Sequence, residues 1–316
     1  MTITLSRRDF LKTSAGISTM AGVSSLGMAY PAAADPLYKI SLAEWSINRS
    51  LFGGQMQHLD FAKIAKGAGI DAIEYVNQFF KDKAKDTAFL KEMNTRAAGE
   101  GVTQVLIMCD GEGNLGDPDV AKRQTAVENH YKWVDAARFL GCHTIRVNGY
   151  SSGTPDEQKK LVADGMRKLC EYADRHDINV VIENHGGLSS NGKWLVGTIK
   201  LVGHKRAGTL PDFGNFRIAG PGRGNPTAKV ESYDSYVGVA EMMPLAKGVS
   251  VKPRVWDANG NQSDIDLKRM MKIVVDAGWR GHCGIEYGPE GKELEGVVEL
   301  RKQLEAVRLE LSSARR

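Results

Sequence analysis

The chain has 316 residues, of which 42% are hydrophobic and 25% are charged, and its formal net charge is +4. This composition is typical of a folded globular protein, and it excludes a collagen-like, a fully disordered or a multi-span membrane chain. No stretch carries the run of about five or six basic residues that binds nucleic acid or anionic lipid, so nucleic acid is not an expected partner.

Residues 1–34 have the features of an export signal. A twin-arginine pattern, Ser-Arg-Arg-Asp-Phe-Leu-Lys, begins at Ser6, and a mildly apolar run follows over residues 13–30. This run contains several serines and glycines, so we expect no stable membrane span. Ala32-Ala33-Ala34 offers a cleavage site. The mature chain, residues 35–316, would then be periplasmic and would carry a net charge of +2.

The mature chain repeats a strand-like run and a helix-like stretch about every 35 residues. One strand, one helix and two loops need about this length, so eight repeats predict a single (β/α)8 TIM barrel over residues 35–316. A doubly wound open sheet is the alternative. The predicted strands begin near Tyr38, Asp71, Thr103, His143, Asn179, Gly208, Gly248 and His282.

Between the strands, apolar residues recur at helical spacing, for example over residues 127–139, 161–172 and 265–274. Gly141 and Gly278 follow two of these stretches and are expected to end the helices. The four cysteines form no Cys-x-x-Cys motif, and we expect buried free thiols because the protein folds in the reducing cytoplasm before export. They are Cys109, Cys142, Cys170 and Cys283.

Two glycine-rich segments are interpreted as loops. Residues 213–229 form the longest irregular stretch, and they follow the sixth strand, where a loop would lie over the mouth of the barrel. Residues 111–116 match Gly-x-Gly-x-x-Gly but lie in the third repeat and precede Asp117-Pro118, where a nucleotide site would need a helix N-terminus. We therefore predict a flexible loop there.

Three acidic residues follow apolar strands in one half of the predicted barrel. Glu183 ends the fifth strand, Asp212 follows the sixth, and Glu286 follows the eighth. The active site of a TIM barrel lies at these strand ends, and strands about 4.8 Å apart allow the three carboxylates to converge. Because carboxylates without a counter-charge repel one another, a bound divalent cation is expected among them.

The motifs Ile-Glu-Asn-His-Gly-Gly, Pro-Asp-Phe-Gly-Asn and Gly-Ile-Glu-Tyr resemble, in this order, those of the xylose isomerase-like barrels in the sugar phosphate isomerase/epimerase branch. The resemblance covers residues 38–310. It implies that Glu183, Asp212 and Glu286 bind one divalent metal ion, and that Glu183 and Glu286 also move protons. Oxygen ligands favour Mn or Mg over Zn.

The seventh strand departs from that pattern. Where the family usually has His-x-Lys, this chain has Ser250-Val251-Lys252, so the fourth ligand is missing or replaced. Lys252 is expected to stabilise a developing oxyanion or to pair with a carboxylate. We expect further contacts to the substrate from His185, Asn148, Trp45, Asn215, Glu74 and Arg146.

These features predict a metal-dependent sugar isomerase or epimerase that removes a proton next to a carbonyl of a sugar or keto-sugar. A lyase that cleaves 3-keto-glycosides and a catalytically silent sugar-binding barrel are the alternatives, the latter suggested by Ser250. An abasic-site endonuclease is disfavoured because Asn215 stands where a further histidine is needed. A second copy of the chain or a co-exported protein is left open as a partner.

Replacing Arg7 and Arg8 by lysine tests the export signal. We expect the variant to stay in the cytoplasm with residues 1–34 attached, because the twin-arginine pattern is lost. Cell fractionation followed by N-terminal sequencing measures this. Mature protein in the periplasm of the double variant would contradict the twin-arginine assignment.

Overall fold

The structure is a computed structural model that describes residues 35–221, 227–289 and 291–315. The predicted export signal, residues 1–34, lies outside the described residues. Residues from Pro36 onward form one compact unit. No helix among the described residues has the length and apolar character needed to cross a membrane.

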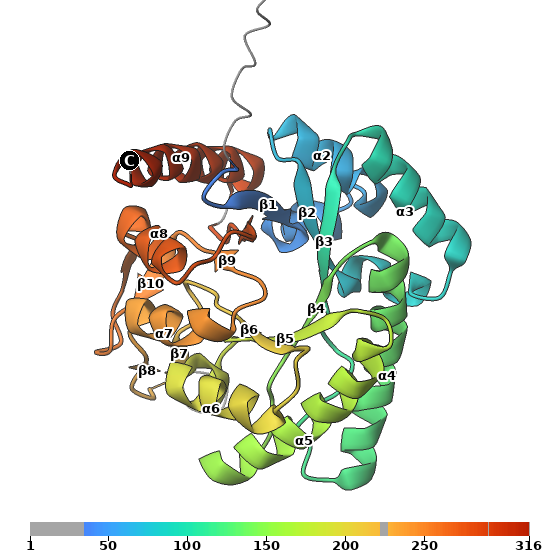
Figure 1. The fold of residues 1–316 in the computed structure, drawn as a ribbon, viewed down its shortest axis with the longest axis vertical. Coiled ribbons are helices and arrows are strands. Elements are labelled where there is room, and N and C mark those ends of the chain that lie inside the picture. The colour runs from blue at the N-terminus through green and yellow to red at the C-terminus, as the bar shows by residue number, and fades with distance from the viewer. Residues whose placement is uncertain (1–34, 222–226, 290, 316) are drawn as a thin grey trace, which may run out of the picture. The chain divides into compact units, whose positions relative to one another are not determined.

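Eight parallel strands form one sheet in the described part of the chain, in the order β6-β5-β4-β3-β2-β1-β12-β9 (Figure 1). Between the two outer strands, the bridges Thr209↔Ala246 and Asp212↔Ser250 bring the sheet nearly to closure. The predicted TIM barrel is therefore confirmed, and the open sheet is wrong. The strands are β1 (Lys39–Ala43), β2 (Ala72–Val76), β3 (Thr103–Met108), β4 (Thr144–Val147), β5 (Asn179–Glu183), β6 (Ala207–Leu210), β9 (Ser250–Val251) and β12 (His282–Ile285).

The helices surround this sheet (Figure 1). Capping residues fix the ends of several of them: α5, for example, starts at a capping box in which Thr154 and Glu157 bond to each other's backbone N–H groups. Gly141 ends α4 with a φ of 75°. The α-helices are α1 (Asn48–Phe52), α2 (Phe61–Gly67), α3 (Thr87–Gly99), α4 (Val120–Leu140), α5 (Pro155–Asp174), α6 (Gly192–Val202), α7 (Ser235–Met242), α8 (Leu267–Asp276) and α9 (Glu293–Ser313).

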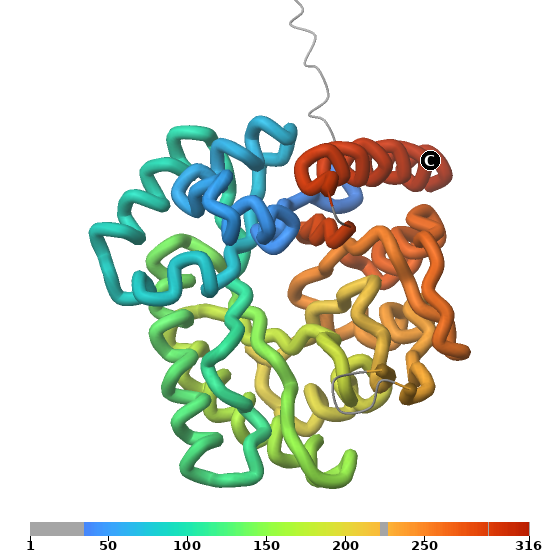
Figure 2. The backbone as a smooth tube through the Cα atoms, turned by 180° about the vertical axis from the view of Figure 1, so that it is seen from behind, coloured from blue at the N-terminus to red at the C-terminus, as the bar shows by residue number. Residues whose placement is uncertain are grey.

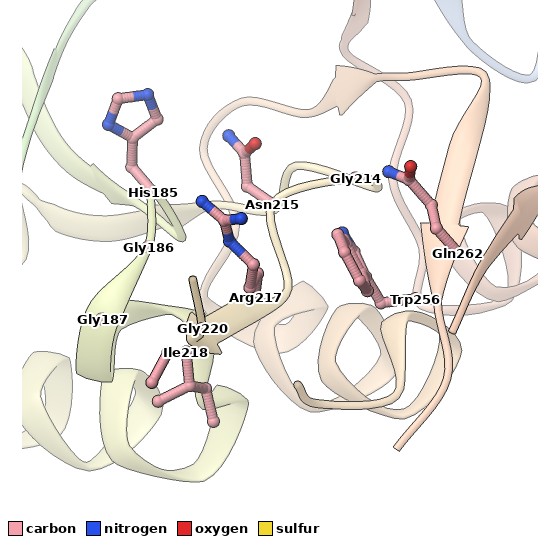
Figure 3. A pocket seen from close by; sticks show the side chains of 11 residues that line it. His185, Gly186, Gly187, Gly214, Asn215, Arg217, Ile218, Gly220, Trp256 and Gln262 are labelled. Atoms are coloured by element: carbon pink, nitrogen blue, oxygen red, sulfur yellow. The ribbon is translucent and has the colours of Figure 1, made fainter. Parts of the chain in front are cut away.

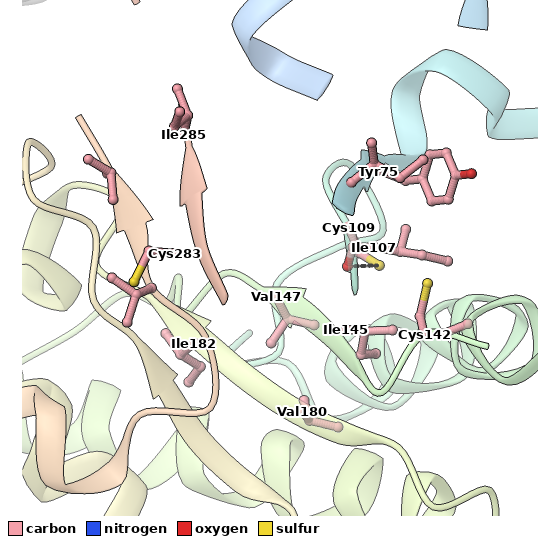
Figure 4. Packing of buried hydrophobic residues seen from close by; sticks show 14 of the residues in the cluster. Tyr75, Ile107, Cys109, Cys142, Ile145, Val147, Val180, Ile182, Cys283 and Ile285 are labelled. Carbon is pink, nitrogen blue, oxygen red and sulfur yellow. Dashed lines mark hydrogen bonds between the residues drawn. The ribbon is translucent and has the colours of Figure 1, made fainter. Parts of the chain in front are cut away.

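Successive side chains of each strand face opposite sides of the sheet, so they form two layers, one under the helices and one inside the barrel. Odd residues of β4 and β12, such as Ile145, Cys283 and Ile285, belong to the large core that packs under the helices (Figure 4). Their neighbours Arg146 and Glu286 therefore point into the barrel, since successive strand residues face opposite sides. This register places polar side chains inside the upper end of the barrel. The four cysteines are buried and free, as predicted.

The last helix secures the first strand. Tyr38, just before β1, donates its hydroxyl to Leu304 O of α9 at 2.6 Å, and Arg308 Nη1 donates to Tyr38 O at 3.0 Å. Figure 2 shows the beginning and the end of the barrel side by side. β1 pairs with β12 on one side and β2 on the other.

Two short hairpins outside the barrel sheet were not predicted. β7 (Arg217–Ala219) pairs with β8 (Glu231–Ser232), and β10 (Arg254–Trp256) pairs with β11 (Gln262–Asp264). The stretch 213–229 is thus only partly a loop, and residues 222–226 of it are outside the described part of the chain. Polar and glycine-rich composition concealed these strands, because neither hairpin has an apolar alternating pattern.

The loop at residues 111–116 is anchored rather than flexible. Glu112 is buried and accepts hydrogen bonds from Trp133 Nε1 at 2.8 Å and Lys132 Nζ at 2.9 Å. Leu115 is fully buried, and its carbonyl oxygen lies against Gly165 of α5. The predicted loop is confirmed, but it is not flexible as predicted, because Glu112 and Leu115 anchor it to the core.

We expect Gly165→Ala to destabilise the protein although alanine is the better helix former. A Cβ at Gly165 would lie 2.0 Å from Leu115 O, so the loop or the helix must shift, at a cost of about 1–3 kcal/mol. Gly197→Ala in α6 is the matched control, because its nearest neighbour, Lys159 Cε, would be 3.6 Å away. It should stabilise by up to about 1 kcal/mol. Urea denaturation measures both, and equal effects would contradict the packing.

Candidate functional site

The three predicted carboxylates come together at the carboxyl ends of the strands. Glu183 ends β5, Asp212 lies two residues after β6, and Glu286 directly follows β12. All three are buried, and one carboxylate oxygen of each lies within 4.8 Å of those of the other two. The convergence that the sequence predicts is present in the described structure.

Two cations lie against this cluster. Lys252 Nζ is 2.8 Å from Glu286 Oε1 and 3.3 Å from Asp212 Oδ2. Arg146 Nε is 2.9 Å from Glu183 Oε2, and Arg146 Nη1 is 2.7 Å from Asp110 Oδ1. Four carboxylates thus face two cations, and the group carries a formal charge of −2 when every carboxyl is ionised.

Ser250 faces the cluster from β9. Its hydroxyl donates to Asp212 Oδ2 at 2.8 Å and lies 3.2 Å from Glu286 Oε2. The side chain therefore occupies a corner between two carboxylates. The register proposed from the sequence places it on the inner face of the seventh barrel strand, and the structure agrees.

The loop after β6 is folded around Asp212. Its Oδ1 accepts backbone N–H bonds from Gly214 and Asn215, each at 2.8 Å, so Oδ2 is directed to the cluster. Asn184 fixes the backbone here by accepting from Asp212 N at 2.7 Å and donating to Asp212 O at 2.9 Å. This role of Asn184 was not predicted from the sequence, although Asn184 directly follows Glu183.

Burial and neighbouring charges divide the carboxyls into two kinds. Burial raises the pKa of Glu183 and of Asp212 to about 7, against the opposing effects of Arg146 and Lys252. At Glu286, burial is outweighed by Lys252, which lowers the pKa of the carboxyl. Although burial disfavours the Lys252 ammonium, Asp212 and Glu286 raise its pKa, so Lys252 is protonated at neutral pH.

Two adjacent cavities lie beside the cluster. The larger, of about 430 Å³, is lined by His185 and Asn215 among other residues, and Figure 3 shows both side chains at its edge. The second, of about 360 Å³, reaches Lys252. Asn215 connects them to the cluster, since its Nδ2 donates to Glu183 Oε1 at 2.9 Å and its Oδ1 accepts from Lys252 at 3.1 Å.

The other expected contacts lie elsewhere. Trp45 packs against Phe52 and Phe79, with ring centroids 6.1 and 6.2 Å away, and lines neither cavity. Asn148 donates to Asp110 Oδ1 at 2.7 Å. Glu74 is buried inside the barrel, where burial raises its pKa to about 7.

Asp110 was missed by the sequence analysis. It follows β3 and holds both Arg146 and Asn148, and these contacts outweigh the effect of its burial and lower its pKa to about 2. Its position directly after a predicted strand end was the signal that could have identified it. His185 Nδ1 lies 2.7 Å from the Tyr150 hydroxyl, a second unpredicted contact.

A sequence profile of the xylose isomerase-like TIM barrel matches residues 62–307. The chain belongs to this family. A search of curated protein sequences gives no significant match.

Solved structures of the same fold include a xylose isomerase domain protein from Planctomyces limnophilus, with 14% identity, a TM-score of 0.65, and coverage of 88% of this chain and 99% of that one. A second is a 3-keto-D-glucoside 4-epimerase from E. coli, with 14% identity and a TM-score of 0.63. The match covers 85% of this chain and 99% of that one. A third is a xylose isomerase-like TIM barrel protein from Mycobacterium smegmatis in complex with magnesium, with 18% identity and a TM-score of 0.63. The match covers 86% of this chain and 96% of that one. These similarities show the shared fold.

The donor set fits a hard divalent cation. Glu183, Asp212 and Glu286 supply buried carboxylate oxygens within reach of one centre, and a charge of +2 matches the formal charge of the group. Ser250 adds a neutral oxygen rather than an imidazole nitrogen. Oxygen ligands of this kind suit Mg or Mn better than Zn.

The raised pKa of Glu183 predicts a pH-dependent stability. Because the folded protein holds this proton to about pH 7 while an unfolded chain releases it near pH 4, Glu183 destabilises the cation-free fold as pH rises between those values. We therefore expect Glu183→Gln to gain melting temperature relative to wild type between about pH 5 and about pH 8 in chelator. Thermal melts measure the difference.

Added Mg²⁺ should stabilise the wild type more at the higher pH, since the ionised carboxylates bind it. The exposed variant Glu128→Gln is the control and should track the wild type at both pH values. A constant difference between Glu183→Gln and wild type would show that burial does not control this carboxyl.

Proposed function

We propose that the protein is a divalent-cation-dependent sugar isomerase or epimerase that acts by removing a proton next to a carbonyl of a sugar or keto-sugar. The observation that carries this proposal is the convergence of Glu183, Asp212 and Glu286, with Lys252 and Arg146 against them, beside two open cavities. Family membership supports it. So does the similarity in fold to a 3-keto-D-glucoside 4-epimerase.

Glu183, Asp212 and Glu286 would hold the cation, with Ser250 at the remaining corner. When bound, such a cation polarises a carbonyl oxygen and stabilises the negative charge that develops on it. The similar structure from Mycobacterium smegmatis, in complex with magnesium, supports this choice of ion.

The two glutamates differ in the cationic side chains that contact them. Lys252 favours the ionised form of Glu286, which can accept the α-proton of the substrate. Glu183 would be ionised while it holds the cation, and once it has taken up a proton it can return that proton to the opposite face and so invert the carbon. Return of the proton to the neighbouring carbon gives isomerisation, and loss of a β-substituent gives elimination.

Arg146 and Asn215 position Glu183. Arg146 holds one carboxylate oxygen at 2.9 Å, and Asn215 donates to the other at 2.9 Å. Asp110 in turn holds the guanidinium of Arg146 at 2.7 Å. The carboxyl is therefore fixed in orientation, which general acid–base chemistry requires. We also propose that this enzyme works in the periplasm, on the basis of the twin-arginine pattern in residues 1–34.

Exchange of the substrate α-proton with D2O tests the function. Glu183→Gln and Glu286→Gln keep the shape of the side chain but remove the charge, so each should reduce exchange of keto-sugars and 3-keto-glycosides by about 10²-fold or more. Mass spectrometry or proton NMR measures the exchange. Activity within a factor of a few in both variants would refute the mechanism, and ligand binding without any exchange in the cation-loaded wild type would favour a silent binding barrel.

Ser250→His tests the open corner of the site. The imidazole nitrogen suits Zn well and Mg poorly, so the variant should gain affinity for Zn by about tenfold or more and gain little for Mg. Competitive calorimetric titrations at one pH measure both metals, because ligand protonation couples to binding. Unchanged Zn affinity in a folded variant would show that residue 250 does not contribute to the cation site.

A further inference from the structure

Two adjacent cavities lie beside the cluster. The larger cavity and the one that reaches Lys252 share Gly214, Asn215 and Gln262 in their lining. The cavity that reaches Lys252 is the inner end of this space, beside the carboxylates. The larger cavity is the outer end, between the two hairpins that the barrel sheet does not include, where Arg217 and Trp256 line it.

The hairpins present recognition side chains to the outer end. Trp256 of β10 pairs with Gln262 of β11, and directly opposed residues of an antiparallel pair lie on the same face. Figure 3 shows Trp256, Gln262 and Arg217 around one common space. The hairpin is anchored, since Val255 is buried and Trp256 N donates to Ser235 Oγ at 2.9 Å. The half-buried indole is therefore a fixed aromatic surface.

The outer end carries one positive charge. Arg217 is the one Lys, Arg, Asp or Glu side chain among the described residues that line the larger cavity. Its guanidinium has no hydrogen bond or ion pair with another described residue. A guanidinium fork without a partner suits a carboxylate, which it can bind through two hydrogen bonds.

We propose that the outer cavity is a second sugar subsite that binds a uronate unit, with its ring on Trp256 and its carboxylate on Arg217. The substrate is then an acidic glycoside of at least two units, whose keto-sugar unit reacts at the inner end. Stacking on an indole and a charge-assisted bond together recognise such a unit. This inference rests on the proposed function for the reacting unit only.

Calorimetry with three disaccharides of the same linkage tests the subsite: glucuronosyl-glucose, glucosyl-glucose and 6-phosphoglucosyl-glucose. The purified protein with Mg²⁺ should bind the uronate at least about tenfold more tightly than the neutral sugar. Arg217→Gln should abolish this preference and leave the neutral affinity unchanged. Trp256→Ala should weaken both sugars, and Trp256→Phe should largely restore them, which separates stacking from misfolding.

Arg138→Gln is the matched control, because Arg138 is exposed in the last turn of α4, at the opposite end of the barrel. It should bind like the wild type. The proposal is overturned by equal affinity for uronate and neutral sugar, by tighter binding of the phosphate, by a preference that survives in Arg217→Gln, or by binding of none of the three.

This test is separate from that of the proposed function. Glu183→Gln should lose exchange but keep the uronate preference, because Arg217 and Trp256 are unchanged. A uronate preference without α-proton exchange in the wild type would refute the proposed reaction and support the subsite. Exchange in the wild type without a uronate preference would support the proposed reaction and refute the subsite.

Discussion

Mutual repulsion among Glu183, Asp212 and Glu286 is the constraint that shapes the upper end of the barrel. Three buried carboxylates within 4.8 Å of one another are unstable unless cations or protons compensate them. Arg146 and Lys252 supply part of that compensation. A divalent ion could balance the remaining charge, so the same electrostatic deficit that destabilises the fold favours a cation in this site.

The cation that compensates each carboxylate also differs from one strand end to the next. Lys252 reaches Asp212 and Glu286, whereas Arg146 reaches Glu183 and is held by Asp110 on the other side. In the cation-free site, burial raises the pKa of Glu183, whereas Lys252 outweighs burial at Glu286 and lowers its pKa. A site that must both accept and donate a proton needs such a separation, and here it follows from the balance between burial and the neighbouring cation at each carboxyl.

The barrel and its acidic cluster could be predicted from the sequence because both depend on local, periodic signals. A repeat of strand and helix locates the strand ends, and an acid at three of those ends gives Glu183, Asp212 and Glu286. The hairpins over the mouth could not be predicted, since their strands are only two or three residues long and are stabilised by pairing with each other. The substrate contacts expected of Asn148 and Trp45 stay predictions, and in the structure Asn148 donates to Asp110 and Trp45 packs against Phe52.

The contact between the first strand and α9 affects when the barrel can close during folding. Tyr38 bonds to Leu304 and Arg308 of α9, and β1 pairs with β12, so the first barrel strand finds its partners far along the chain, with 266 positions between Tyr38 and Leu304. Sequence separations of this size make ring closure a late step. The barrel can therefore close only after β12 and α9 have been synthesised, and until then a nascent chain exposes the edge of β1 to chaperones and proteases.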